Sequence, residues 1–165
     1  MRVVVSCDGA ARGNPGPAGI GAVVAGEDEE VLAEVAEGIG VATNNVAEYR
    51  AALAGLERAR ALGATDVLLR SDSRLLIEQL AGRFRVKNPS LQRLHREVRE
   101  VLSMFESFHL QHVPREQNKD ADRLANIGVD DWLATEGAGY VPPGPPAKLF
   151  DGGLEGGAQG SGVQD

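Results

Sequence analysis

The order of strand-like and helix-like segments constrains the fold of this chain most strongly. Three strand-like runs come first, and two more follow, each after helix-like segments. The expected strands are residues 2–7, 20–25, 31–37, 66–70 and 108–113, and the expected helices are residues 45–62, 74–81, 89–105 and 118–134. Strands joined by short loops pair antiparallel, whereas strands joined through a helix usually lie parallel. The order therefore predicts an α/β fold whose sheet combines an antiparallel meander with parallel strands.

Local patterns support these boundaries. The first expected strand is mostly β-branched and apolar, which is typical of a strand buried on both faces. Residues 9–19 are rich in glycine and proline and predict a loop. Tyr49, Leu53 and Leu56 recur at helical spacing in the first expected helix, and Gly63 follows it as a helix-ending glycine.

Composition divides the chain into two parts. The 165 residues suit one domain, which we place at residues 1–135. Residues 137–165 contain nine of the 21 glycines and four of the eight prolines, with few large apolar side chains. Such a segment buries too little surface to order itself, so we expect residues 136–165 to form a flexible tail.

Charge and cysteine content limit the classes of partner. A formal net charge of −7 means that nucleic-acid binding needs a local basic patch or metal ions. A single cysteine, Cys7, forms no intramolecular disulfide, which fits a reducing cytoplasm. The chain shows no signal-peptide pattern, and no apolar run approaches the roughly 18 residues that span a membrane. We expect a monomeric, cytoplasmic protein without membrane association.

Four carboxylates stand in four short polar phrases of the chain. Asp8 and Asp72 end apolar runs that we expect to be strands, and Glu48 and Asp122 lie near the starts of expected helices. Side chains at the carboxyl ends of parallel strands meet at one edge of a sheet. A carboxylate cluster repels itself unless cations hold it, and a set of four suits Mg²⁺ or Mn²⁺ better than zinc. The pattern predicts a divalent metal site and phosphate chemistry.

Each carboxylate also has an ordinary structural interpretation. Asp8 fits a turn residue that bonds to nearby backbone amides. Glu48 with Asn45 resembles a capping box, and Asp72 fits a helix N-cap. Asp122 fits a solvent-facing position on a helix. The combination of all four favours the metal site over these separate interpretations.

The phrases around these carboxylates resemble the type 1 ribonuclease H family. They read D-G-A-A-R-G-N-P-G-P-A-G-I-G, T-N-N-V-A-E, S-D-S and H-V-P-R-E-Q-N-K-D-A-D-R-L-A-N, in the order and approximate spacing of that family. The match covers about residues 1–130 and is most similar to the compact prokaryotic members. The resemblance implies the ribonuclease H-like fold, which is a five-stranded mixed sheet with helices on both faces.

The resemblance also implies an activity and a cofactor. It implies an endoribonuclease that hydrolyses the RNA strand of RNA–DNA hybrids and leaves 3′-hydroxyl and 5′-phosphate ends. Two ions, Mg²⁺ or Mn²⁺, would act in catalysis. Asp8 would bridge both ions, Glu48 and Asp72 would complete one ion site, and Asp122 would help to hold the other beside the attacking water.

Substrate contacts follow from the same motifs. The 2′-hydroxyl distinguishes RNA from DNA, and asparagine side chains can bind it because they offer both donors and acceptors. The expected contacts are Gly9, Asn14, Thr43, Asn44, Asn45, Ser73 and Asn118. Helix capping is an alternative role for Asn45. Activity on double-stranded RNA stays an open possibility.

A basic segment between residues 83 and 99 is a candidate for phosphate binding. Its cations are Arg83, Arg85, Lys87, Arg93, Arg96 and Arg99, against one acid, Glu97. The alternative is an ordinary solvated helix face. The basic protrusion of larger family members is absent, because only residues 82–89 link the two helices. We therefore expect weak hybrid binding that salt weakens further.

His112 and Arg115 are candidates for assisting turnover. Histidine moves protons near neutral pH, whereas arginine can hold a phosphate oxygen. A packed structural histidine is the alternative for His112, and we favour Arg115. Cys7 points to the sheet face opposite Asp8 by strand alternation, which predicts a buried structural thiol.

Two other functions remain as alternatives. One is another nuclease on the same scaffold, either a resolvase or an exonuclease. The other is a non-catalytic nucleic-acid-binding module with a degenerate site. The T-N-N-x-x-E phrase and the glycine-rich first loop argue against the former, and the presence of all four acids argues against the latter.

Overall fold

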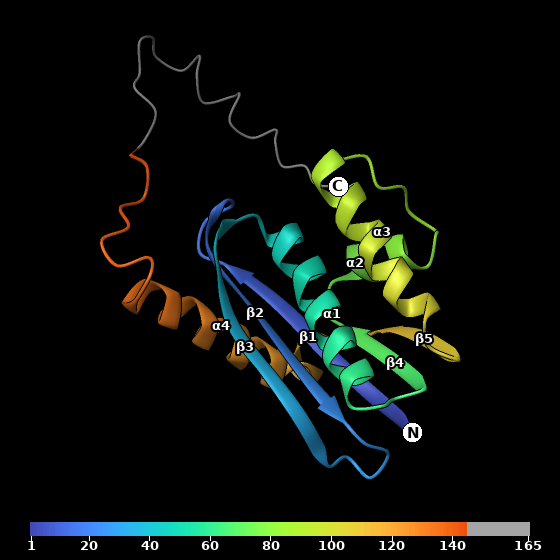
Figure 1. The fold of residues 1–165 in the computed structure, drawn as a ribbon. Helices are drawn as coiled ribbons and strands as arrows, with labels where there is room; N and C mark the ends of the chain where they lie inside the picture. Colours follow the sequence, from blue (N-terminus) through green and yellow to red (C-terminus); the bar gives the residue numbers. More distant parts are fainter. Residues whose placement is uncertain (145–165) are drawn as a thin grey trace.

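The computed structural model describes residues 1–144 and contains five strands and four α-helices in the expected order (Figure 1). The elements are β1 (Arg2–Ala11), β2 (Gly16–Ala25), β3 (Val31–Ala42), α1 (Asn44–Ala61), β4 (Asp66–Ser71), α2 (Arg74–Leu80), α3 (Pro89–Ser103), β5 (Ser107–His112), the 3₁₀ turn η1 (Arg115–Gln117) and α4 (Lys119–Ala134).

The sheet has the strand order β3-β2-β1-β4-β5. β1 pairs antiparallel with β2, and β2 pairs antiparallel with β3, whereas β4 pairs parallel with both β1 and β5. This arrangement confirms the predicted mixed sheet. Cys7 of β1 lies opposite Ser71 of β4 in the parallel register, so the next residues, Asp8 and Asp72, reach the same place along the sheet.

The strand ends differ from the sequence prediction. The expected loop at residues 9–19 is mostly strand, because Gly9–Ala11 of β1 pairs with Ala18–Ile20 of β2. Asp8 therefore lies inside β1, whereas we had expected it to follow the end of that strand. β3 also continues five residues beyond the predicted end at residue 37, to Ala42. The hydrogen bonds of a neighbouring strand offset the weak strand preference of these glycine-rich segments.

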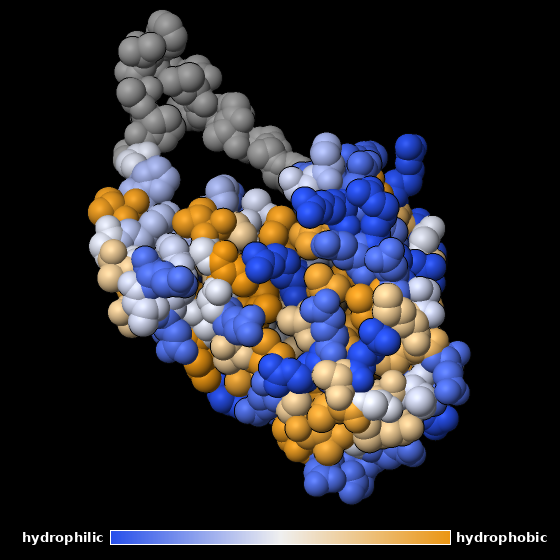
Figure 2. Space-filling model, in the orientation of Figure 1, coloured by the Kyte–Doolittle hydropathy of each residue, from blue (hydrophilic) through white to orange (hydrophobic). Residues whose placement is uncertain are grey.

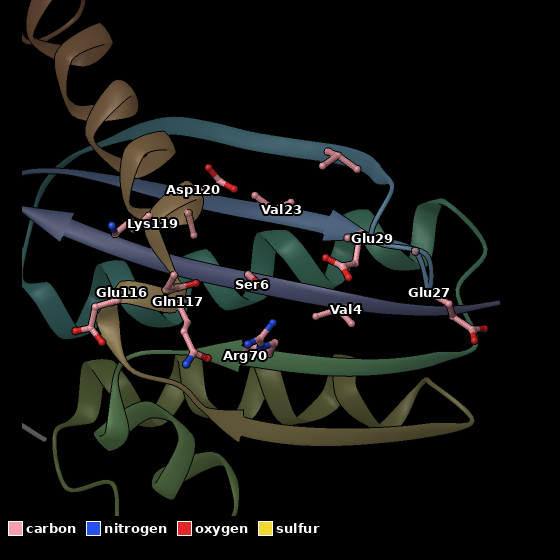
Figure 3. Close-up of a pocket in the computed structure, with 15 residues that line it drawn as sticks. Val4, Ser6, Val23, Glu27, Glu29, Arg70, Glu116, Gln117, Lys119 and Asp120 are labelled. Atoms are coloured by element: carbon pink, nitrogen blue, oxygen red, sulfur yellow. The ribbon is translucent and has the colours of Figure 1, made fainter.

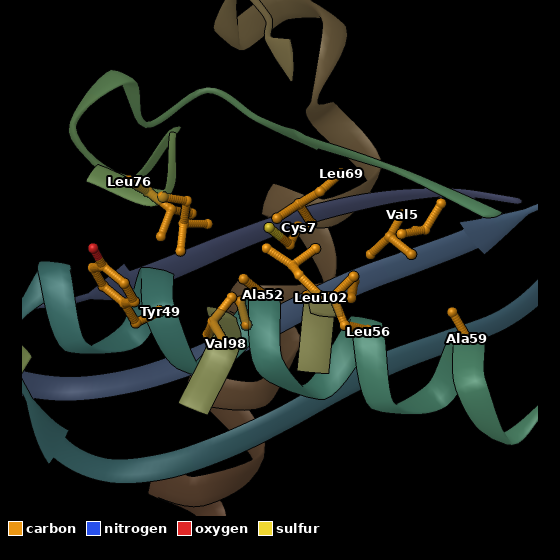
Figure 4. Close-up of a cluster of buried hydrophobic side chains, with 14 of the residues drawn as sticks. Val5, Cys7, Tyr49, Ala52, Leu56, Ala59, Leu69, Leu76, Val98 and Leu102 are labelled. Carbon is orange, nitrogen blue, oxygen red and sulfur yellow. The ribbon is translucent and has the colours of Figure 1, made fainter. Parts of the chain in front are cut away.

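Helices cover both faces of the sheet. α1, α2 and α3 lie on one face and α4 lies on the other (Figure 1). The main core fills the space between the sheet and the first group of helices, where Val5, Cys7 and Leu69 meet Leu56 and Leu102 (Figure 4). Cys7 is fully buried in this core, which confirms the prediction of a structural thiol.

On the other face, α4 approaches the backbone of the sheet closely. A Cβ atom at Gly21 of β2 would lie 2.2 Å from the Ala121 carbonyl oxygen of α4. Glycine at this position therefore allows the beginning of α4 to lie directly on the sheet. Gly21 pairs with Asp8 in the β1–β2 register, and cross-strand partners face the same side, so Asp8 faces α4.

The observed helix N-caps exclude Asn45 and Asp72 as capping residues. The cap of α1 is Thr43, whose Oγ1 accepts a hydrogen bond from the Val46 amide at 3.2 Å, so Asn45 is not the cap. The cap of α2 is Ser73, whose Oγ accepts from the Leu76 amide at 3.2 Å, so Asp72 is not the cap. The α1 helix ends before Gly63, as predicted, with a φ of +91° at this glycine.

The chain after α4 folds back on that helix. The ring of Tyr140 meets the ring of Trp132 edge to face at 6.1 Å, and the Gly137 amide donates to the Trp132 carbonyl at 2.7 Å. Most of the expected flexible tail, residues 145–165, lies outside the described residues, and the domain boundary stays a prediction. Within residues 1–144, no helix is long and apolar enough to cross a membrane.

Candidate active site

Three of the four predicted carboxylates converge beside the neighbouring inner strands β1 and β4. Oxygen atoms of Asp8, Glu48 and Asp72 all lie within 4.8 Å of one another. β1 supplies Asp8, the second turn of α1 supplies Glu48, and Asp72 is the first residue after β4. Residues separated by up to 64 positions in the sequence thus form one compact acidic cluster.

A backbone amide of β1 positions Glu48. Its Oε1 accepts a hydrogen bond from the Gly9 N–H at 3.0 Å. The capping-box interpretation of Glu48 is therefore wrong, because its carboxylate bonds to β1 and Thr43 caps the helix. Gly9 was expected to contact substrate, but its amide holds Glu48 and its missing side chain makes room for the backbone of α1.

Asp122 of α4 lies beside Asp8 on the sheet face that α4 covers, opposite the face on which α1 supplies Glu48. It is close enough to raise the pKa of Asp8, and it is half-buried in the first turn of α4. The neighbouring acid on the same helix, Asp120, has a side chain that is 79% exposed. The interpretation of Asp122 as a solvent-facing residue therefore does not hold.

The cluster is electrostatically strained without a counterion. Burial, the charge of Asp72 and a hydrogen bond that the protonated Asp8 donates to Asp122 together raise the pKa of Asp8 to about 8, with burial as the largest cause. Burial also raises the pKa of Glu48, with the charge of Asp8 as the next cause. Three converging oxygen donors with this excess of negative charge fit a hard divalent cation.

These shifts predict an unusual pH dependence of stability in metal-free protein. The Asp8 pKa rises from 3.8 in its ordinary state to about 8 in the folded protein, so between these values the folded state binds more protons than the unfolded state. Stability therefore falls as the pH rises from about 4 to about 8. Thermal melting in EDTA should give a lower Tm at pH 8.5 than at pH 5.5, and Asp8→Asn should reduce this difference. Equal Tm values at the two pH values would contradict the prediction.

Four predicted substrate contacts lie at the start of α1 and the turn before β2. Asn14 Oδ1 accepts a hydrogen bond from the Asn44 amide at 3.0 Å, which ties the two segments together. The Thr43 hydroxyl accepts from the helix backbone, and its own proton can still be donated to a phosphate. Asn44 is exposed and Asn45 is partly exposed, so both asparagine side chains lie where a substrate can reach them.

The other two predicted contacts are Ser73 and Asn118. Ser73 caps α2 through its oxygen, and its hydroxyl proton can likewise be donated. Asn118 is 2% exposed and its Nδ2 donates to the Cys7 carbonyl at 2.9 Å. Its side chain therefore holds the backbone of β1, and a role as a direct substrate contact stays a prediction.

Arg115 and His112 are both accessible. His112 is the last residue of β5 and is exposed, so the packed structural histidine is excluded. Arg115 lies in η1 and lines a hollow of about 560 Å³ together with Asp122, Lys119 and Arg123. The shared hollow places the Arg115 guanidinium on the same surface as a candidate catalytic carboxylate.

The basic segment is only partly available for binding. Arg83 pairs with Glu78, and Arg99 donates to the Leu80 carbonyl at 2.7 Å. Arg85, Arg93 and Arg96 are exposed, on the strongly polar surface that covers α3 and the preceding link (Figure 2). These three cations are the better candidates for contact with phosphates.

A larger hollow of about 590 Å³ lies on the part of the sheet face that α4 leaves open. Val4, Ser6 and Arg70 line it from the strands, and Lys119 lines it from the start of α4 (Figure 3). None of the four candidate carboxylates lines this hollow. The larger of these two hollows is therefore not the one that contains a candidate catalytic carboxylate.

Two residues of the site region were quoted in the sequence motifs but received no role. Arg12, in the turn after β1, hydrogen-bonds to Asn126 of α4, and Asn126 contacts Asp122. The spacing of four residues between Asp122 and Asn126 could have revealed their shared helix face. Nothing in the sequence connects Arg12 to either residue.

A family model and individual relatives both match this chain. Residues 6–128 match the family model described as reverse transcriptase-like. The chain is 50% identical over 131 residues to a bifunctional protein of Mycobacterium tuberculosis. It is 46% identical over 130 residues to ribonuclease HI of Halobacterium salinarum. These matches cover 79% of this chain, but 36% of the mycobacterial protein and 65% of the halobacterial one.

Solved structures agree with the sequence matches. The N-terminal ribonuclease H domain of the mycobacterial protein superposes with a TM-score of 0.77, covering 79% of this chain and 100% of that domain chain at 50% identity. Ribonuclease H1 of Halobacterium salinarum gives 0.78 at 46% identity, covering 79% and 99%. A ribonuclease H1 from compost, solved in complex with an RNA/DNA hybrid, gives 0.76 at 38% identity, covering 79% and 99%. With its fold, its acidic cluster and these relatives, the chain belongs to the type 1 ribonuclease H family.

Proposed function

We propose that this protein is a metal-dependent endoribonuclease that hydrolyses the RNA strand of RNA–DNA hybrids and leaves 3′-hydroxyl and 5′-phosphate ends. The observation that carries the proposal is the convergence of Asp8, Glu48 and Asp72 oxygens within 4.8 Å. The ribonuclease H1 from compost that was solved with a hybrid supports the choice of substrate.

The carboxylates fit a pair of Mg²⁺ or Mn²⁺ ions in their donor chemistry. Asp8 would help to hold both ions, Glu48 and Asp72 would complete the site of one, and Asp122 would help to hold the other. Bound ions would supply an activated water and stabilise the charge of the leaving oxygen. The protein itself holds the carboxylates in place through the Gly9 amide and the first turn of α4.

Recognition of the RNA strand would use the segments beside the cluster. Asn44 and Asn45 present amide groups at the start of α1, and an amide can both donate to and accept from a 2′-hydroxyl. The hydroxyl protons of Thr43 and Ser73 would be donated to backbone phosphates. The exposed Arg85, Arg93 and Arg96 would contribute salt-sensitive phosphate contacts.

A comparison of three substrates tests the proposal. An RNA–DNA hybrid, a DNA duplex and an RNA duplex of the same sequence are each incubated with the protein and Mg²⁺ or Mn²⁺. Cleavage of the RNA strand in the hybrid alone, with 3′-hydroxyl and 5′-phosphate products, is the expected result. Cleavage of the DNA duplex would support another nuclease, and binding of the hybrid without cleavage would support a binding module.

Arg115 should matter more for turnover than His112. The Arg115 guanidinium shares a hollow with Asp122 and can hold a phosphate oxygen. Losing one such charge-assisted bond, at about 1.5–3 kcal/mol, corresponds to about a 10- to 100-fold loss of kcat. We expect Arg115→Ala to show this loss and His112→Ala to show less, in steady-state assays on one hybrid.

The control for Arg115→Ala is Arg60→Ala, which removes the same charge from the exposed last turn of α1. This variant should keep the rate of the parent protein. A greater loss of kcat in His112→Ala than in Arg115→Ala would reverse the assignment of these two residues.

A further inference from the structure

The Asp122 carboxylate occupies an unfavourable position. It lies beside Asp8, whose carboxylate converges with those of Glu48 and Asp72. When these carboxyl groups are ionised, as metal binding requires, repulsion between like charges favours rotation of the Asp122 side chain away from them and into solvent. A hydrogen-bond donor on its outer side can oppose that rotation, and α4 supplies such a donor one turn later.

Asn126 is this donor. Its Nδ2 donates to the Asp122 backbone carbonyl at 3.0 Å and lies 3.4 Å from Asp122 Oδ1. The amide thus spans both the backbone and the carboxylate of the residue four positions earlier. Because Asn126 lies within α4, its position is fixed by the packing of that helix on the sheet.

Arg12 determines which way the Asn126 amide points. Its Nη2 donates to Asn126 Oδ1 at 3.2 Å and also approaches the Asn126 backbone carbonyl at 3.5 Å. A guanidinium has donors only, so it must face the amide oxygen. The amide nitrogen is then left facing Asp122. The opposite amide orientation would place two N–H donors against the guanidinium and an oxygen against the carboxylate.

Arg12 is itself held by a second contact on α4. Its Nη1 donates to Asp130 Oδ1 at 2.8 Å, one helical turn beyond Asn126. Arg12 and Asp130 are substantially exposed, with side chains 42% and 66% accessible. An exposed pair of this kind contributes little to stability. The contact with Asp130 matters here because it holds the Arg12 guanidinium beside Asn126.

We propose that Arg12 and Asn126 are positioning residues that hold the Asp122 carboxylate toward Asp8 for catalysis. The inference rests on the proposed function, because it assigns a role to these residues within that site. Arg12 acts on Asn126, and Asn126 acts on Asp122, so the two residues form one chain of hydrogen bonds. Their effects on activity should therefore be coupled and not additive.

A double-mutant cycle tests the proposal. Asn126→Ala should lower kcat by about 10- to 100-fold, which is the usual effect of losing a residue that orients a metal-binding side chain. KM should be nearly unchanged. Arg12→Ala should lower kcat in the parent protein but cause no further loss in the Asn126→Ala background. Asp131→Asn, which changes an exposed acid on the same helix, is the control and should keep the parent rate.

A second measurement separates positioning from a general loss of structure. Mn²⁺ titration by calorimetry should show weaker binding in Asn126→Ala than in the parent protein, while the two Tm values in EDTA stay close. If the parent protein cleaves no hybrid, the proposed function fails and the Mn²⁺ titration alone decides the inference. Unchanged Mn²⁺ affinity in Asn126→Ala, or additive effects of the two substitutions on kcat, would overturn it.

Discussion

Asp8→Asn is expected to lower the rate of hybrid cleavage by about 1,000-fold or more. Asp8 is 5% exposed and both Asp72 and Asp122 act on its pKa, so in the proposed mechanism its carboxylate would help to hold both ions. A ligand lost from a catalytic metal site removes several kcal/mol of transition-state stabilisation, and each 1.36 kcal/mol is about a tenfold change in rate. Single-turnover cleavage of a labelled hybrid measures this loss.

The same substitution should not destabilise the metal-free protein at high pH. Asparagine has nearly the shape of aspartate but carries no charge, so it removes both the cost of burying a charge at position 8 and the repulsion from neighbouring carboxylates, the two main causes that raise the pKa of Asp8. At pH 8.5 in EDTA, the Tm of Asp8→Asn should equal or exceed that of the parent protein.

Asp120→Asn is the matched control for Asp8→Asn, because it makes the same chemical change on a side chain that is 79% exposed. It should retain the parent rate. Cleavage by Asp8→Asn within tenfold of the parent rate would rule out the assigned role of the carboxylate cluster.

Gly9→Ala should both destabilise the fold and impair the site. A Cβ atom at this position would lie 2.3 Å from the Ala47 carbonyl carbon and 2.5 Å from the Glu48 nitrogen, so α1 must move away from β1. This movement would stretch the bond of 3.0 Å between the Gly9 amide and Glu48 Oε1. We expect a loss of about 3 kcal/mol in the free energy of unfolding, with Tm lower by about 10 °C, and a marked loss of cleavage.

Gly26→Ala provides the control for this substitution. A Cβ atom at Gly26 would meet Asp28 Oδ1 at 3.4 Å and Leu32 Cδ1 at 3.8 Å, which are ordinary contacts. Its Tm and its rate should stay near those of the parent protein. Thermal melts followed by circular dichroism compare the variants, and a Tm of Gly9→Ala within one or two degrees of the parent would show that α1 adapts without cost.

Local patterns were sufficient for the order and type of the elements. The helical spacing of Tyr49, Leu53 and Leu56, and the glycine at position 63, located α1 to within one residue at each end. The patterns failed at the hairpin ends, where Gly9–Ala11 is strand because β2 lies beside it. Backbone pairing of this kind depends on a partner segment, and side-chain preference does not encode it locally.

The sequence predicted the four carboxylates of the candidate site but not the hydrogen bond that positions Glu48. Family motifs identified Asp8, Glu48, Asp72 and Asp122, and the structure brings the first three together and places the fourth beside Asp8. The role of Gly9 in holding Glu48 was not foreseen, because it involves a backbone amide that every residue carries.

The contact that Asn118 makes with β1 was not predicted for a similar reason. Asn118 was expected among the substrate contacts, and its side chain turns inward to the Cys7 carbonyl. Motif spacing shows which residues are near one another along the chain, but it does not show which way a polar side chain turns.

The sequence by itself determined the succession of strands and helices and the identities of the four carboxylates, because periodicity and motif spacing are properties of the chain. Only the tertiary structure decided the extent of the strands, the inward position of Asn118 and the contact of Arg12 with Asn126. Each of these depends on hydrogen bonds between segments that lie far apart in the sequence, and such bonds form only when packing brings their partners together.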